Sequence, residues 1–121
     1  LGLGYSGASL PVVERLLAMD AAGVVPVVPR QGSLGASGDL APLAHLCLPL
    51  LGEGRVFAPG GGTEPAVAAL ARHGWAPVAL GPKDGLALIN GTQFMAAYAA
   101  EVVQRARHLA TVADVLAAMG V

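Results

Sequence analysis

The sequence has few charged residues and a single cysteine. Charged residues account for 12% of its 121 positions, whereas about a quarter is usual in soluble globular domains. Apolar residues reach 55% and the mean hydropathy is +0.63, which excludes an intrinsically disordered chain. A chain this short has a large surface for its volume, and little polar material is present to cover it. We therefore expect a piece of a larger, mostly buried protein or one protomer of an obligate oligomer, and a chain that opens at Leu1 rather than methionine agrees with this.

The charges that are present form no basic patch. Seven Lys or Arg residues and eight acidic residues leave a net charge of −1, and Lys83 is the only lysine. Binding to nucleic acid depends on neutralising backbone phosphates, so no nucleic-acid partner is expected. Cys47, the only cysteine, can form no disulfide within the chain and has no partners for a zinc site, which favours a reducing, cytoplasmic location. The longest apolar stretch, residues 40–51, is interrupted by two prolines and is too short to cross a bilayer.

Apolar residues at helical spacing predict a mainly α fold. Proline in a first turn and glycine after the last apolar residue mark the ends of several segments. Pro26 and Pro29 forbid a helix and favour extended chain between them. Helices are expected over residues 11–22, 40–51, 64–73, 83–89 and 92–119, with short extended or hairpin segments around residues 24–31 and 54–80.

The last of these helices is apolar over most of its circumference. Four of its polar residues form one narrow stripe at positions i, i+3, i+4 and i+7, namely Glu101, Gln104, Arg105 and His108. Such a helix must be buried on several sides, and some 28 residues of helix are roughly 40 Å long. The shorter helices cannot surround it, so its partner surface is expected to lie outside this chain.

Two glycine-rich segments are candidates for chemistry. Residues 2–7 match the pattern G-x-G-x-x-G, but no strand precedes them and Asp20 falls within a helix, so a glycine-rich turn is favoured over a dinucleotide site. Residues 32–38 contain three glycines together with Ser33 and Ser37. A serine hydrolase remains an alternative there, although the G-x-S-x-G pattern of a nucleophile elbow is missing.

A different chemistry is open to Ala36-Ser37-Gly38. The amide nitrogen of Gly38 can attack the carbonyl carbon of Ala36 to close a five-membered ring with loss of water. Loss of the Ser37 hydroxyl as a second water then leaves an exocyclic methylidene. Glycine leaves the attacking nitrogen unhindered and tolerates the compressed backbone. Asp39 can assist proton movement and cap the following helix, whose positive N-terminal end would make the methylidene more electrophilic.

Longer stretches around these residues resemble a known family. Gly-Ser-Leu-Gly-Ala-Ser-Gly-Asp-Leu-Ala-Pro-Leu-Ala-His, at residues 32–45, closely resembles the signature of the histidine and aromatic amino-acid ammonia-lyases. Their electrophile, 4-methylideneimidazol-5-one (MIO), forms from this Ala-Ser-Gly. Residues 85–93, Gly-Leu-Ala-Leu-Ile-Asn-Gly-Thr-Gln, and residues 4–7 also look like the family. The order and spacing agree, so the resemblance covers essentially all of this chain but only a small part of a family member.

The resemblance implies roles for a few residues. Ala36, Ser37 and Gly38 are the expected MIO precursors, with Asp39 in a supporting role, and no dissociable cofactor or metal is implied. Asn90 corresponds to the asparagine that contacts the prosthetic group and the substrate, although an ordinary Asn-Gly turn is its plainer interpretation. The family's catalytic tyrosine lies N-terminal to anything here, so Tyr5 and Tyr98 are expected to be packing residues.

The resemblance also implies an activity for the full-length protein. It would eliminate ammonia from L-histidine to give trans-urocanate, or act as a phenylalanine or tyrosine ammonia-lyase or an aminomutase. Family members are mostly α-helical homotetramers whose active sites draw on three subunits. The chain would then be a single fragment that is inactive alone. Residues 1–38 would form a helix and the electrophile-forming loop, residues 39–91 helices and a connecting segment, and residues 92–121 a long core helix. The non-enzymatic alternative is a helical interaction segment in which Ala36-Ser37-Gly38 is only a turn.

Overall fold

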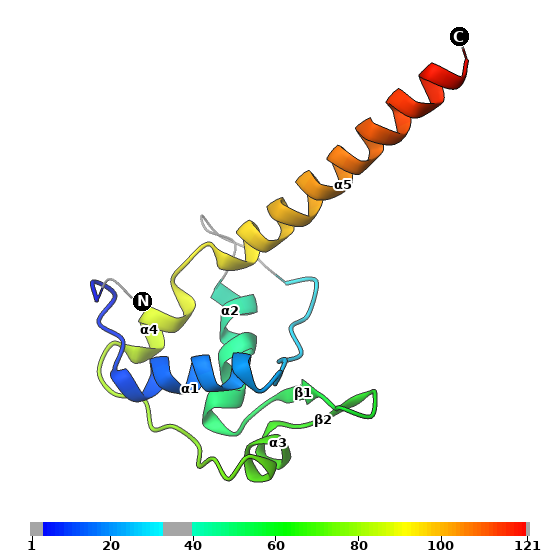
Figure 1. Cartoon of the computed structure of the whole chain (residues 1–121). Coiled ribbons are helices and arrows are strands. Elements are labelled where there is room, and N and C mark those ends of the chain that lie inside the picture. The colour runs from blue at the N-terminus through cyan, green and yellow to red at the C-terminus, as the bar shows by residue number, and fades with distance from the viewer. Residues whose placement is uncertain (1–3, 33–39, 121) are drawn as a thin grey trace.

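The computed structural model describes residues 4–32 and 40–120, and it is mainly α-helical, as the sequence predicts (Figure 1). Five α-helices, one short 3₁₀ helix and one two-stranded sheet are found in this described part of the chain. In chain order they are α1 (Leu10–Ala21), α2 (Leu40–Cys47), the 3₁₀ helix η1 (Leu48–Leu51), β1 (Arg55–Phe57), β2 (Thr63–Pro65), α3 (Ala66–Arg72), α4 (Asp84–Ile89) and α5 (Gln93–Met119).

The prediction of a single α-helix over residues 40–51 is wrong for its last four residues. The α-helix ends at Cys47, and Leu48–Leu51 continue as a 3₁₀ turn. Pro49 has no backbone N–H to donate, and its ring would clash with the carbonyl group four residues earlier. Gly52 closes the turn in the left-handed conformation (φ 78°), and its N–H donates to the Pro49 carbonyl oxygen at 3.1 Å.

The extended segments expected from the sequence are confirmed as a small sheet. β1 pairs antiparallel with β2, with Val56 opposite Glu64. On the other side of β1, Val27 N–H donates to the Arg55 carbonyl oxygen at 2.9 Å, which brings the extended chain of residues 24–31 alongside. The helix expected from residue 64 begins at Ala66 instead, because residues 63–65 pair with β1.

A small hydrophobic core joins α1, η1, β1 and α3. Leu50 is completely buried, and the extended chain beyond α3 is tied to it because Val78 N–H donates to the Leu50 carbonyl oxygen at 2.8 Å. Each of these four elements contributes buried apolar side chains, and α2, α4 and the segment directly after α1 add one each. The core contains Val12, Met19, Val24, Cys47, Leu50, Val56, Ala66, Ala69 and Leu88.

The last helix, α5, extends away from this core (Figure 1). None of its residues is buried, and among the other helices it packs mainly against α2. Apolar side chains in its middle and second half, such as Val102, Leu109 and Leu116, are 61% to 66% exposed. The described part of the chain therefore offers no cover for α5, in line with the expectation of a partner surface elsewhere. No helix described here is both long enough and apolar enough to span a membrane.

Candidate active site

The expected MIO precursors Ala36, Ser37 and Gly38, together with Asp39, lie outside the described residues. What the structure places is the chain on either side of them. The preceding segment ends at Gly32 in a left-handed conformation (φ 104°). The following helix, α2, begins at Leu40, the residue directly after Asp39.

Asn90 lies where α4 ends, as the sequence predicts. Its backbone N–H donates to the Leu86 carbonyl oxygen at 3.0 Å, while its φ and ψ of −95° and 86° take the chain out of the helix. Its side chain is exposed and forms no hydrogen bond with any residue that the structure describes. The primary amide therefore has donor and acceptor groups free to meet a ligand.

Two helices that pack together bring these segments into one region. α4, which directly precedes Asn90, packs against α2, which begins at Leu40. A hydrophobic cavity of about 300 Å³ lies between them and the first turn of α5. Its lining includes Pro42 and Leu43 of α2, Leu88 of α4 and Phe94 of α5. Asn90 and the start of α2 thus belong to one packed unit.

A buried aspartate holds the other end of α4. Asp84 Oδ1 accepts a hydrogen bond from Ser9 N–H at 2.6 Å, and Oδ2 accepts from Gly81 N–H at 2.7 Å and from the Ser9 hydroxyl at 2.8 Å. These bonds, led by the one from the Ser9 backbone, hold the pKa of the Asp84 carboxyl below its usual value. The sequence analysis did not single out Asp84, and its only local signal is an acidic residue in a first helical turn.

His45 and Cys47 do not form a metal site. His45 is exposed on α2, whereas Cys47 is buried, and burial raises the pKa of its thiol to about 11. In residues 4–32 and 40–120, no three His, Cys, Asp or Glu side chains are grouped closely enough to hold a metal ion.

The expectation that Tyr5 is a packing residue is wrong for the described chain. Its side chain is 90% exposed, because the loop that carries it lies at the surface before α1. Tyr98 does pack, in an edge-to-face contact with Phe94 whose ring centroids are 4.9 Å apart.

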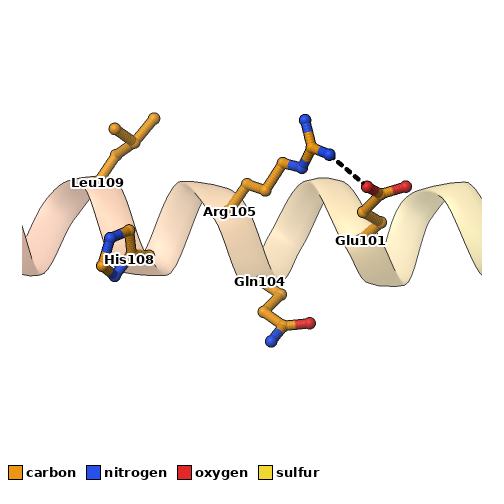
Figure 2. A pocket seen from close by; sticks show the side chains of 5 residues that line it. All are labelled: Glu101, Gln104, Arg105, His108 and Leu109. Atoms are coloured by element: carbon orange, nitrogen blue, oxygen red, sulfur yellow. Dashed lines mark hydrogen bonds and ion pairs between the residues drawn. The ribbon is translucent and has the colours of Figure 1, made fainter.

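Four polar residues of α5 lie on neighbouring turns of the helix, while Arg107 and Asp114 lie elsewhere on its surface. Figure 2 shows Glu101, Arg105 and Leu109 on successive turns along one edge, with His108 on the face of the helix and Gln104 pointing away from the opposite edge. Glu101 and Arg105 form an ion pair at i, i+4 spacing. Both side chains are more than half exposed, so the pair contributes less than about 1 kcal/mol to stability.

The fold and the site together define a mainly α-helical segment in which the helix that precedes Asn90 packs against the helix that begins at Leu40. The sequence profile of the aromatic amino acid lyase family matches residues 1–121. The chain belongs to that family.

Individual relatives agree with this assignment. A histidine ammonia-lyase of Gloeobacter violaceus is 56% identical over 119 residues, which is 98% of this chain and 23% of the relative. The crystal structure of histidine ammonia-lyase from Trypanosoma cruzi superposes with a TM-score of 0.78 at 46% identity, covering 88% of this chain and 21% of that one. Phenylalanine ammonia-lyase from Rhodosporidium toruloides superposes with a TM-score of 0.65 at 36% identity, covering 74% of this chain and 14% of that one. The chain thus spans a quarter or less of the length of these relatives.

Proposed function

We propose that this chain is the electrophile-forming segment of an ammonia-lyase that acts on L-histidine and releases trans-urocanate. The observation that carries the proposal is the 56% identity to a histidine ammonia-lyase over nearly the whole chain. In the structural superpositions the identity is 46% to a histidine ammonia-lyase and 36% to a phenylalanine ammonia-lyase. A phenylalanine or tyrosine ammonia-lyase, or an aminomutase, is therefore the second candidate.

In this proposal, Ala36, Ser37 and Gly38 supply the prosthetic group themselves. Gly38 N bonds to the Ala36 carbonyl carbon, and two waters leave, the second carrying the Ser37 hydroxyl. Once formed, MIO supplies an electrophilic carbon for the amino-acid substrate. The surroundings fit such a group, because α2 begins directly after Asp39 and directs the positive end of its dipole toward the preceding residues.

Asn90 is the residue of the described chain that we assign to the substrate and prosthetic group. Its exposed amide can donate hydrogen bonds to an oxygen or nitrogen that gains negative charge during elimination. Asp39 is assigned a supporting role in proton movement during cyclisation. A base that removes the substrate's β-proton is not assigned to any residue of this chain.

The remaining parts of the proposal concern the full-length protein. We propose that it is a cytoplasmic homotetramer in which residues 92–121 form a core helix covered by other parts of the assembly. Residues 1–38 and 39–91 then form the electrophile-bearing part and its helical support. The exposed apolar side chains of α5 support this division, and the isolated 121-residue chain is expected to be inactive and to associate.

The test is made on the full-length protein that contains this segment. Trypsin cuts after Arg30 and Arg55 and at no residue between them, so one peptide, residues 31–55, carries the whole electrophile site. We expect this peptide to weigh two waters less than its sequence, and Ser37→Ala to restore the full mass and abolish the release of urocanate from L-histidine. An unmodified Ser37 in an active enzyme would refute the MIO proposal and leave Ala36-Ser37-Gly38 as a turn.

A substrate panel separates the candidates within the family. The full-length enzyme is assayed with L-histidine, L-phenylalanine and L-tyrosine under the same conditions. We expect kcat/KM to be highest for L-histidine, with the unsaturated acid as the product. A preference for L-tyrosine or L-phenylalanine, or a β-amino acid product, would favour the second candidate.

A further inference from the structure

The carboxylate of Asp84 joins two segments that are far apart in the sequence. Ser9, which it binds through both the backbone N–H and the hydroxyl, lies 75 residues away and is the N-cap residue directly before α1. Gly81 binds the same carboxylate, and Asp84 N–H in turn donates to the Gly81 carbonyl oxygen at 3.2 Å. Asp84 is completely buried. Its three hydrogen bonds therefore fix the first residue of α4 against the start of α1.

The turn before Asp84 is built around this arrangement. Lys83 adopts the left-handed conformation (φ 70°), which is unfavourable for a residue with a Cβ. Its side chain lies over Gly7, where a Cβ would come within 3.3 Å of Lys83 Nζ. The loop before α1 and the turn before α4 thus contact each other through both Lys83 and Asp84.

α4 connects the fixed residue Asp84 to Asn90. The helix has six residues, so its two ends are about 9 Å apart. At one end of α4, the carboxylate of Asp84 binds the helix to the start of α1. Along its side, α4 packs against α2, and Asn90 follows directly after its other end. A short helix that is held at its start and along one side gives the residue at its end a defined position.

We propose that Asp84 is a positioning residue that sets the place of Asn90 relative to the start of α2. This inference rests on the proposed function, because it needs Asn90 to contact the substrate or the prosthetic group. Asp84 itself contacts neither in this proposal, and it acts only through α4.

The hydrogen-bond pattern makes a carboxylate necessary at this position. Each of its two oxygens accepts a bond from a backbone N–H, Oδ1 from Ser9 and Oδ2 from Gly81. In an Asp84→Asn variant the NH₂ group must take one of these two places and would face a backbone donor. Either orientation of the amide leaves one partly buried N–H without its acceptor, which is unfavourable. Ser9→Ala removes the hydroxyl bond alone and leaves both backbone bonds possible.

The experiment is a double-mutant cycle in the full-length enzyme. Asp84→Asn is measured alone and combined with Asn90→Ala, and kcat is expressed per protomer whose 31–55 peptide has lost two waters. We expect Asp84→Asn alone to lower kcat by about 100-fold, the scale of a displacement of about 1 Å in an active-site group. In the Asn90→Ala background we expect no further loss, because the group that Asp84 positions is already absent.

Other outcomes distinguish the possible failures. Equal losses of kcat in both backgrounds, or no loss from Asp84→Asn alone, would overturn the positioning role. If Asp84→Asn does not fold, Ser9→Ala is carried through the same cycle, with a several-fold loss expected in the parent and none in Asn90→Ala. Asp20→Asn, the same change at an exposed position of α1, is the matched control and should leave kcat unchanged. Failure of the proposed function is recognised separately, because the unsubstituted enzyme would then show neither the lighter peptide nor ammonia release.

Discussion

Gly52 allows the segment after α2 to turn back over the core, and replacing it with alanine should open this part of the fold. Its φ is 78°, and a Cβ would lie 3.1 Å from Pro77 Cγ. Two other glycines separate these effects. Gly23 has a φ of 67° with nothing within 4 Å of its Cβ position, and Gly60 has neither a positive φ nor a near neighbour.

The expected magnitudes follow from this comparison. A left-handed residue with a Cβ costs about 1–2 kcal/mol, which the reduced entropy of the unfolded alanine chain offsets by about 0.4–1 kcal/mol. Gly23→Ala should therefore cost about 1 kcal/mol. Gly60→Ala lacks the backbone cost and should be neutral or slightly stabilising. Gly52→Ala adds the overlap with the Pro77 ring, and overpacking of this kind costs about 1–3 kcal/mol, so the total should be about 2–4 kcal/mol.

Amide hydrogen exchange in the full-length protein measures these costs locally. The free energy of opening is obtained from peptides within residues 48–57 for Gly52→Ala and from peptides that cover each control position. We expect Gly52→Ala to lower the free energy of opening by at least about 1 kcal/mol more than Gly23→Ala does, since the overlap with the Pro77 ring adds that much. Equal effects of the two variants would refute the close approach of Gly52 to Pro77.

Two further predictions concern titration. Burial raises the pKa of Cys47 from 9.0 to about 11, so its contribution to stability should fall as the pH rises between these values. Iodoacetamide should label Cys47 at pH 8 only when urea opens the core. Rapid labelling of the native enzyme, mapped by mass spectrometry, would contradict this burial. The pKa of Asp84 is shifted in the opposite direction, downward. Its contribution to stability is therefore complete above the ordinary pKa of about 3.9 and is lost as the pH falls through the pKa of the folded state. Asp84→Ala should reduce the acid-side loss of stability seen in pH-dependent unfolding. An unchanged acid limb in that variant would mean that the carboxylate is not held by Ser9 and Gly81.

Local patterns in the sequence predict most of the helices, since periodicity, proline and glycine act over a few residues. The long helix expected over residues 92–119 is found at Gln93–Met119, and the first helix at Leu10–Ala21. The break at Cys47 was missed, although Pro49 is a sufficient local cause.

Contacts between distant residues were beyond such patterns. Asp84 meets Ser9 only after α1 and α4 have packed, and no spacing in the sequence relates the two. Asn90 was found through a resemblance, because an Asn-Gly pair alone indicates no more than a turn. Its place at the end of a helix packed on α2 gives that assignment a structural basis.

The central claim is that Ala36, Ser37 and Gly38 lose two waters and become an electrophile. The most direct measurement is the mass of the tryptic peptide of residues 31–55 from the active, full-length enzyme, with fragmentation to locate any change. The account predicts a deficit of two waters confined to residues 36–38. A peptide of full mass from enzyme that still releases ammonia from L-histidine would contradict it.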